Sequence, residues 1–174
     1  MRIIGGEFRS RRLKSPEGLA TRPTPDRLRE SLFNILAPVI ADKVFVDAYA
    51  GCGSVGLEAL SRGARRVVFI ERSRPALKTL EENVRILKAE GRARVIHGNV
   101  ATFLKAQPAD IVFLDPPYEA EAEYEIALTA ASADLVIAQH ASRVSLQERY
   151  GRLERYRVVK QGDNSLSFYR PAAE

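Results

Sequence analysis

Four apolar residues, IVFL, run into Asp115-Pro116-Pro117-Tyr118 past the middle of the chain. Each proline fixes φ and lacks a donor N–H, so a regular strand must stop here. The residue before each proline is also biased toward an extended conformation. The sequence therefore predicts that Asp115 lies at the C-terminal end of a strand, followed by a stiff turn that presents an aromatic ring. A carboxylate, unpaired carbonyls and a ring placed in this way could surround one flat polar molecule.

A second chemical motif, DAYAGCGSVG, occupies residues 47–56. Gly51, Gly53 and Gly56 have G-x-G-x-x-G spacing, which lets the backbone approach a nucleotide cofactor closely. Glu71 follows 20 residues after Gly51, where an acid can hold ribose hydroxyls. The spacing alone fits a dinucleotide, S-adenosylmethionine, or a turn that serves only helix–strand packing.

Asp47, which precedes the glycines, favours one of these ligands. A carboxylate at this place suits a ligand with an ammonium or sulfonium group and repels a pyrophosphate. Dinucleotide sites instead face the phosphates with a helix N-terminus. Asp47, Glu71, Asn99 and Asp115 all follow or end predicted strands, and open α/β sheets bind ligands outside those ends. The pattern therefore favours S-adenosylmethionine.

The elements that must position these residues alternate between short apolar strands and helical patterns. Strands are expected at 43–48, 66–71, 94–97, 110–114 and 134–140, and helices at 54–62, 73–89, 100–105 and 121–131. Such alternation predicts an α/β fold with a mostly parallel sheet and helices on both faces. The tail differs, because two strand patterns at 153–160 and 165–170 flank a turn-rich stretch and predict an antiparallel hairpin.

The N-terminal segment carries the chain's excess positive charge. Residues 1–29 hold eight Lys and Arg against three Asp and Glu, whereas the other 145 residues hold 19 of each. Residues 1–14 predict a small basic hairpin around Gly5-Gly6, and a helix is expected next, with Thr24 as N-cap and Pro25 at its first position. A basic arm on a neutral body suits a polyanionic partner, and a solvated tail fits the charge count equally.

Length and composition narrow the class of protein. A chain of 174 residues with 45% hydrophobic residues is expected to form one domain with a small appendage. No apolar run is long enough for a transmembrane helix, and the first ten residues do not form a signal peptide. The single cysteine, Cys52, excludes an internal disulfide and a thiolate metal cluster. We therefore expect a cytoplasmic protein that needs no metal.

Taken together, DAYAGCGSVGLEAL, VVFIE, HGNV and IVFLDPPY resemble the class I S-adenosylmethionine-dependent methyltransferases that act on amines. RIIGGEFRSRRLKSP and TRPTPDRLRESLFNIL narrow the likeness to the RsmD family, which methylates the exocyclic 2-amino group of a guanine in 16S ribosomal RNA. The resemblance covers nearly the whole chain. It implies a Rossmann-like fold, S-adenosylmethionine as cofactor and a small-subunit particle as partner, and a monomer is expected from the size of the chain. It also implies a basic RNA-binding extension at 1–22 and a methyltransferase domain at 23–174.

The resemblance further implies a role for each matching residue. The target amine is expected to bind Asp115 and the Pro116 carbonyl, within a catalytic turn that Pro117 and Tyr118 complete, with the tyrosine stacked on guanine. The cofactor is expected to contact the glycine loop and the strand ends, namely Asp47, Tyr49, Ala50, Gly51, Gly53, Glu71, Arg72, Asn99, Val100, Arg22 and Thr24. The RNA is expected to contact Arg2, Arg9, Arg11, Arg12, Lys14 and Arg27.

Two departures from the family pattern and several alternatives stay open. Cys52 replaces a more usual Ser or Thr, and Gln139 stands where Glu is typical, so the role of position 139 is undefined. The same motifs could serve an amino-methyltransferase for another RNA, DNA adenine or protein glutamine. A nicotinamide-dependent oxidoreductase and a non-catalytic RNA-binding or assembly factor are the alternatives from other classes.

Overall fold

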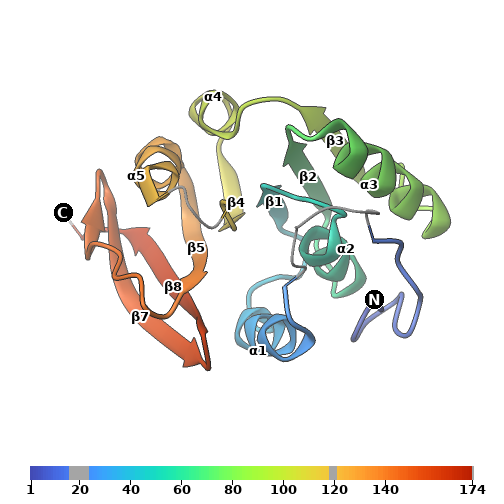
Figure 1. Ribbon diagram of the computed structural model, residues 1–174, viewed down its shortest axis with the longest axis horizontal. Helices are drawn as coiled ribbons and strands as arrows, with labels where there is room; N and C mark the ends of the chain where they lie inside the picture. Colours follow the sequence, from blue (N-terminus) through green and yellow to red (C-terminus); the bar gives the residue numbers. More distant parts are fainter. Residues whose placement is uncertain (16–23, 118–120, 174) are drawn as a thin grey trace.

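The computed structural model of the protein describes residues 1–15, 24–117 and 121–173. Its described strands form one sheet in the order β3-β2-β1-β4-β5-β8-β7-β6 (Figure 1). The parallel strands are β1 (Val44–Ala48), β2 (Arg66–Glu71), β3 (Ala93–His97), β4 (Ala109–Leu114) and β5 (Ala133–Ala141). The antiparallel strands are β6 (Arg149–Tyr150), β7 (Leu153–Gln161) and β8 (Asn164–Pro171). The predicted parallel sheet and C-terminal hairpin are confirmed.

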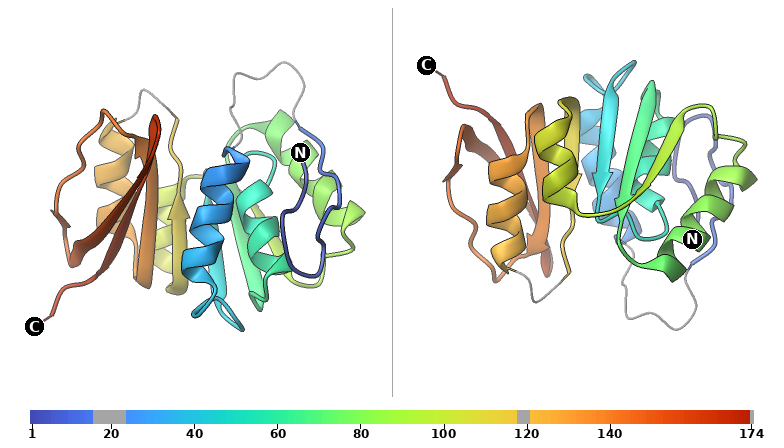
Figure 2. Two further views of the ribbon diagram at one scale, coloured as in Figure 1. Left: turned by 90° about the horizontal axis from the view of Figure 1, so that it is seen from below. Right: turned by 90° about the horizontal axis from the view of Figure 1, so that it is seen from above.

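Helices cover both faces of the sheet, as Figure 2 shows. On one face lie α1 (Asp26–Leu36), α2 (Ser54–Ser61) and α3 (Arg74–Ile86), and on the other α4 (Val100–Ala106) and α5 (Glu121–Ala130). Successive strand residues point to opposite faces, so each central strand contributes side chains to two hydrophobic cores. Phe45 and Phe113 join the cluster beneath α1, α2 and α3, whereas Val46 and Val112 join the cluster beneath α4 and α5. This double burial explains why the central strands read as continuous apolar runs.

The start of α1 differs from the prediction. Pro25, with φ −55° and ψ 143°, is the residue before the helix, and no side chain caps the first turn. The prediction of Thr24 as N-cap is therefore wrong, because the extended Pro25 delays the helix to Asp26. The Thr24 hydroxyl instead donates a hydrogen bond to Oε1 of Gln139 in β5, at 3.1 Å. This contact fastens the beginning of α1 to the sheet.

The predicted N-terminal hairpin is confirmed in the backbone, although residues 1–15 form no regular strand. The amides of Ile3 and Leu13 donate across the hairpin to the carbonyls of Arg11 and Met1, at 3.0 and 2.8 Å, and the amide of Ser10 donates to the carbonyl of Ile3 at 2.9 Å. The one described antiparallel bridge of the hairpin joins Arg2 and Arg12. Ile3, Phe8 and Leu13 are buried in the α1–α3 core cluster, so the side chains of this segment pack on the domain rather than on each other. The boundary predicted at residue 22 lies outside the described residues. We call residues 1–14 the N-terminal arm.

Side chains of α2 and α3 bind the backbone of the N-terminal arm. Glu58 of α2 accepts hydrogen bonds from the amides of Ile4 and Gly5 at 2.9 and 3.0 Å. Asn83 of α3 accepts from the Lys14 amide at 2.7 Å and donates to the Lys14 carbonyl at 3.0 Å. The backbone groups of the arm are therefore satisfied in two ways, by hydrogen bonds across the hairpin and by side chains of the domain.

Membrane-spanning helices are absent from the described part of the chain, because none of its helices has the length and apolar character needed to cross a bilayer.

Candidate active site

A cavity of about 940 Å³ opens at the carboxyl ends of β1, β2, β4 and β5. The strand order reverses between β1 and β4, and such a switch point is where open α/β sheets bind ligands. Most described residues that the sequence assigned to cofactor and amine binding line this cavity: Thr24, Asp47, Tyr49, Ala50, Gly51, Glu71, Arg72, Asn99, Val100, Asp115, Pro116 and Pro117. The fold thus brings residues of β1, β2 and α4, together with residues before α1 and after β4, to one cavity.

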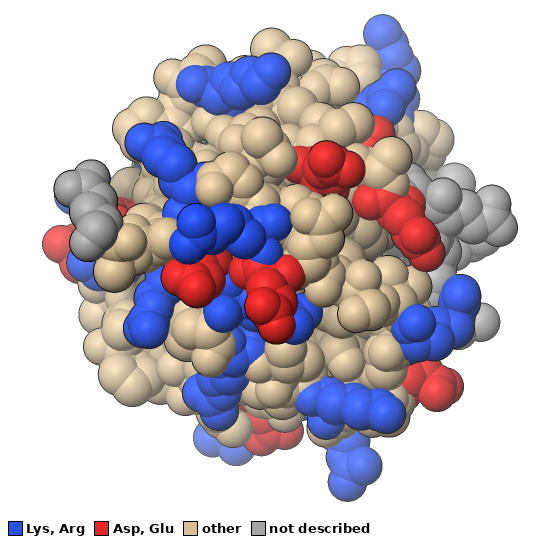
Figure 3. Space-filling model, turned by 90° about the vertical axis from the view of Figure 1, so that its left-hand side faces the viewer, with Lys and Arg blue, Asp and Glu red and all other residues tan. Residues whose placement is uncertain are grey.

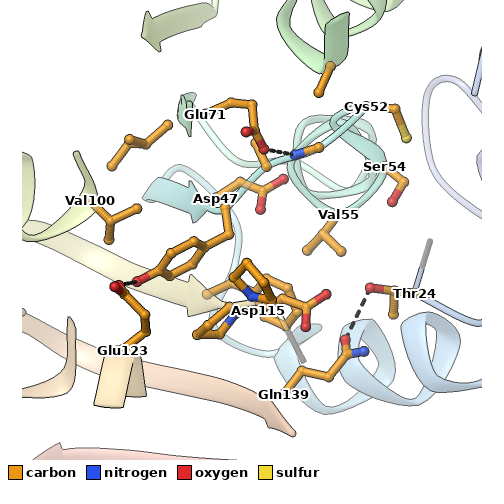
Figure 4. A pocket seen from close by; sticks show the side chains of 18 of the residues that line it. Thr24, Asp47, Cys52, Ser54, Val55, Glu71, Val100, Asp115, Glu123 and Gln139 are labelled. Carbon is orange, nitrogen blue, oxygen red and sulfur yellow. Dashed lines mark hydrogen bonds between the residues drawn. The ribbon is translucent and has the colours of Figure 1, made fainter. Parts of the chain in front are cut away.

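Two carboxylates mark the centre of the cavity. Asp47 belongs to β1 and Asp115 follows the neighbouring strand β4, with Asp47 in register with Phe113. Figure 4 shows both side chains turned toward the same space. Asp47 is buried, and its Oδ2 accepts a hydrogen bond from the Gly56 amide at 2.9 Å. This carboxylate therefore also holds the first turn of α2.

The two acids share an environment that disfavours negative charge. Burial raises the pKa of Asp47 well above its usual value, and the charges of Asp115 and Glu71 raise it further, while the hydrogen bond from Gly56 opposes the shift. Burial also raises the pKa of Asp115 to about 7. Like charges and low polarity both favour the neutral acid. A cation in this cavity would relieve that penalty, so the site is suited to a positively charged ligand.

Glu71 organises the loop that follows β1. Its Oε1 accepts from the Gly51 amide at 2.9 Å, and its Oε2 accepts from the amides of Arg72 and Ser73 at 2.7 and 2.8 Å. Both carboxylate oxygens are thus occupied by backbone donors. Remaining lone pairs can still accept from ribose hydroxyls, so the expected role of Glu71 coexists with a structural one that the sequence analysis missed.

The three glycines of the loop serve different needs. Gly51, with φ +58°, lines the cavity, and a Cβ added there would meet nothing within 4 Å. Gly53, with φ +89°, lies beneath the loop, where a Cβ would stand 2.3 Å from Cδ1 of Leu80. Gly56 faces Phe69 in the same way. Gly53 was predicted to contact the cofactor, yet it does not line the cavity, and its requirement for glycine is explained by packing and positive φ.

Asn99 has a second role at the start of α4. Its Oδ1 accepts from the Thr102 amide at 3.1 Å and so caps the helix. An adenine amine would need this same oxygen as acceptor. The Nδ2 group can instead donate to a ring nitrogen of a base. Val100 lines the cavity beside it and can pack on the flat side of such a ring.

Several lining residues were missed or read otherwise from the sequence. The Tyr49 hydroxyl donates to Oε2 of Glu123 in α5 at 2.9 Å, and Glu123 was not assigned to the site from the sequence. Tyr124 donates to the Gln139 carbonyl at 2.7 Å, and His140 bonds to a serine of β8. Helical spacing and position at a strand end were the features of the sequence that could have found these residues, but neither feature shows the direction in which a side chain points.

Cys52 lies in the cavity wall as a buried thiol whose pKa is raised by burial. A protonated, buried thiol is a poor nucleophile. Its carbonyl accepts a hydrogen bond from Asn83 at 3.0 Å, so the residue contributes backbone rather than chemistry. No group of three potential metal ligands occurs within residues 1–15, 24–117 and 121–173.

The remaining predicted residues lie away from the cavity or outside the described part of the chain. Arg22 and Tyr118 belong to the residues that the structure does not describe. The side chains assigned to RNA are all exposed: Arg2, Arg9, Arg11, Arg12, Lys14 and Arg27. Two of them have partners on the domain, because Arg11 donates to the Ile86 carbonyl at 2.8 Å and Lys14 pairs with Glu82 at 3.2 Å.

A family model described as Conserved hypothetical protein 95 matches residues 1–170, and 120 residues are 50% identical to Ribosomal RNA small subunit methyltransferase D of Escherichia coli. The chain belongs to the RsmD family. The Escherichia coli match covers 68% of this chain and 60% of that relative, so the chain spans less than two thirds of its length.

Two further comparisons extend over nearly the whole chain. YlbH of Bacillus subtilis, a proposed rRNA methyltransferase, is 32% identical over 98% of both proteins. The solved structure of yhhF, a proposed methyltransferase of Escherichia coli, superposes with a TM-score of 0.86 at 38% identity, covering 100% of this chain and 99% of that one. The expected class I methyltransferase fold is thereby confirmed for this RsmD-family member.

Proposed function

We propose that this RsmD-family protein transfers a methyl group from S-adenosylmethionine to the exocyclic 2-amino group of a guanine in 16S ribosomal RNA. The observation that carries the proposal is the pair formed by the buried Asp47 and the partly buried Asp115 at the switch point of the sheet. Their raised pKa values suit a cationic sulfonium cofactor. The names of the relatives that match this chain support an RNA substrate.

The cavity residues fit the parts of S-adenosylmethionine. The backbone of Gly51 and the carboxylate of Asp47 would hold its methionine portion, Glu71 its ribose, and Val100 with Asn99 its adenine. The chemistry that the cofactor supplies is an electrophilic methyl group on sulfur. A volume of about 940 Å³ exceeds what the cofactor alone needs and leaves room for a nucleobase beside Asp115.

The amine would be oriented by the turn after β4. A guanine amine is a weak nucleophile because its lone pair is delocalised into the ring. Acceptors at Asp115 and the Pro116 carbonyl would favour a pyramidal nitrogen aimed at the methyl group, and such positioning supplies much of the rate. The carboxylate would also stabilise positive charge that develops on nitrogen. Tyr118, outside the described residues, is proposed to stack on the base. An unpaired guanine reaches this cavity at least cost.

The N-terminal arm is proposed to bind the phosphate backbone. Arg9, Arg11 and Arg12 are exposed, and each phosphate that they neutralise would add to the salt dependence of RNA binding. We propose that the substrate is a small-subunit particle and that the enzyme acts as a cytoplasmic monomer. Neutralising the three arginines should weaken RNA binding and flatten its salt dependence, whereas an unchanged slope would mean that the arm is only a solvated surface.

The decisive test is methyl transfer from labelled S-adenosylmethionine to unmodified small-subunit RNA and to 30S particles, followed by digestion to nucleosides. Label in N2-methylguanosine is the expected result. Label in another nucleoside would refute the guanine assignment, and absence of label despite cofactor binding would refute the proposed substrate. Asp115→Ala should abolish transfer while cofactor binding persists, and wild-type transfer by this variant would remove Asp115 from the mechanism.

A further inference from the structure

Residues 30–174 have no net charge, yet their acidic and basic residues are concentrated in different stretches of the chain. Residues 106–142 contain seven Asp and Glu and no Lys or Arg, whereas residues 143–173 contain seven Lys and Arg and three Asp and Glu. The first stretch includes α5, and the second includes the β7–β8 hairpin. Figure 3 shows the end of the molecule that carries this hairpin, with Lys and Arg in blue over much of the surface. The two stretches have net charges of opposite sign, so a count along the chain hides part of the positive charge that the hairpin carries.

Three residues near the open end of the hairpin form a compact exposed group. Tyr156 is 43% exposed, and the guanidinium of Arg170 lies 4.5 Å from the centre of its ring. Arg157 lies 5.9 Å from the ring of Phe168, which Tyr156 also contacts. None of the ion pairs among the described residues includes Arg157 or Arg170. We call Tyr156, Arg157 and Arg170 the hairpin patch.

The hairpin patch lies on the same side of the sheet as α1 and the N-terminal arm. Phe168, on which the patch rests, belongs to the core cluster that α1, α2 and α3 cover. In the left view of Figure 2, α1 stands between the arm and the β7–β8 hairpin. The acidic helix α5 covers the opposite face. A polyanion is therefore attracted along the α1 side and repelled from the α5 side.

The hairpin also reaches the cavity. Asn164, at the turn between β7 and β8, lines the cavity wall, and Gln161 at the same turn bonds to Ser31 of α1 at 3.4 Å. Five residues of extended strand separate Gln161 from Tyr156, a span of roughly 17 Å. Strand β7 thus connects the rim of the cavity with the hairpin patch.

We propose that the hairpin patch is a second RNA-binding surface, which stacks an unpaired base on Tyr156 and contacts neighbouring phosphates through Arg157 and Arg170. The inference rests on the proposed function, because it supplies the RNA. Aromatic rings beside a basic surface are how proteins bind unpaired nucleotides of any sequence. Arginines that lie on rings keep their N–H groups available for phosphates. The patch would hold a segment that flanks the target guanine while the N-terminal arm holds another.

Protection of an open sheet edge would also explain the arginines of the hairpin patch. β6 pairs with Leu153 and Glu154, and the Arg155 amide donates to the Glu148 carbonyl, so the edge of β7 is open beyond Arg155 in the described part of the chain. Charged side chains on an open edge also prevent association with other sheets. That explanation accounts for arginine but gives no reason for a large exposed ring such as Tyr156, which would promote association. The aromatic residue therefore discriminates between the two.

The test measures binding of a fluorescent unmodified small-subunit RNA fragment at several salt concentrations. The double variant Arg157→Gln/Arg170→Gln should lower the slope of log affinity against log salt by about 1.4 to 1.8, since each lost phosphate contact removes about 0.7 to 0.9. Tyr156→Ala should weaken binding about tenfold, and Tyr156→Phe should retain it, because stacking needs only the ring. The matched control is Arg65→Gln/Arg66→Gln, at the start of β2, which lies next to the edge strand at the other end of the sheet. Both arginines are exposed, and their replacement should leave the slope unchanged.

The outcomes separate this inference from the proposed function. If the wild-type protein methylates RNA but the patch variants bind with wild-type affinity and slope, the hairpin patch is not an RNA surface and the proposed function stands. Association of the patch variants into larger species, seen by light scattering with RNA binding intact, would establish protection of the edge instead. If the wild-type protein neither binds nor methylates the RNA, the proposed function fails as well. S-adenosylmethionine binding, measured for each variant, confirms that the fold is intact.

Discussion

The ionisation of Asp115 should control the pH dependence of methyl transfer. Burial raises the pKa of this carboxyl to about 7, so the neutral acid persists at pH values where an exposed aspartate is fully charged. A neutral carboxyl is a weaker hydrogen-bond acceptor, and it has no negative charge to stabilise the positive charge that develops on the target nitrogen. An acid with pKa near 7 is ionised to about 10% at pH 6 and about 90% at pH 8. The value of kcat/KM should therefore rise about tenfold between these pH values and level off above pH 8.

The assay distinguishes the free protein from its cofactor complex. The profile of kcat/KM for S-adenosylmethionine reports groups in the free enzyme, and the profile of kcat reports them in the complex. A bound sulfonium favours the carboxylate, so the midpoint for kcat should lie below that for kcat/KM. Asp47 titrates in the same cluster, and removing its charged neighbour should lower its pKa. Asp115→Asn should consequently abolish the midpoint near 7, whereas Glu125→Gln, on the exposed side of α5, should keep it.

The same pKa shift has a consequence for stability. Between the usual aspartate pKa of 3.8 and about 7, native Asp115 keeps a proton that the unfolded chain has released. The free energy of unfolding of the ligand-free protein should therefore fall as pH rises across this window and stay level above it. Asp115→Asn should remove this part of the decline. A flat kcat/KM profile from pH 5.5 to 8.5, or a midpoint below 5, would refute the argument that burial holds Asp115 neutral.

Three further predictions concern the scaffold. Gly53→Ala should lower the free energy of unfolding by about 1 to 3 kcal/mol and weaken cofactor binding, because the new Cβ would stand 2.3 Å from Leu80 at φ +89°. In Gly51→Ala the new Cβ meets no atom within 4 Å, so thermal denaturation should show a smaller loss of stability. Asn83→Ala removes three hydrogen bonds to the arm and the glycine loop and should lower the free energy of unfolding by about 2 to 4 kcal/mol. Isothermal titration should also show weaker S-adenosylmethionine binding. Unchanged affinity would show that the loop does not need this support. Glu58→Gln leaves Arg29, which is buried in α1, with the exposed Asp26 as its remaining anionic partner among the described residues and should cost about 3 to 5 kcal/mol. Hydrogen exchange at the arm should become faster, and an arm as protected as in the wild type would contradict the anchoring role.

The sequence predicted the fold in detail where periodicity and turn chemistry agree. Continuous apolar runs gave the five parallel strands, and the Gln161–Asn164 turn gave the hairpin. Thr24 was misplaced because local capping rules do not include a partner such as Gln139, which lies 115 residues away. The hairpin of the N-terminal arm was predicted, but its attachment to the domain was not, since the burial of Ile3 and the bonds to Glu58 depend on tertiary contacts.

The site was predictable to the level of strand ends and no further. Asp47, Glu71 and Asp115 could be placed near one another because parallel strands end at the same edge of a sheet. Their hydrogen bonds could not, because the donors are backbone amides whose directions depend on the folded loop. Gly53 shows the limit clearly: the motif predicted contact with a ligand, while the structure gives it a steric role against Leu80. Within one glycine motif, one glycine can thus be required by packing while another lines the ligand site.

The N-terminal arm and the cofactor loop are joined by one buried side chain. Asn83 is fully buried, and its Nδ2 donates at 3.0 Å both to the Lys14 carbonyl and to the Cys52 carbonyl. A shift of the arm therefore disturbs a group that also fixes the loop beside Gly51. Residues proposed to contact RNA phosphates and residues proposed to hold the cofactor are separate along the chain, yet they share this support. A free solvated tail would not need a buried amide to hold its end, so the charge of the arm and its attachment are best explained together, by a surface that must hold its substrate at a fixed position relative to the cavity.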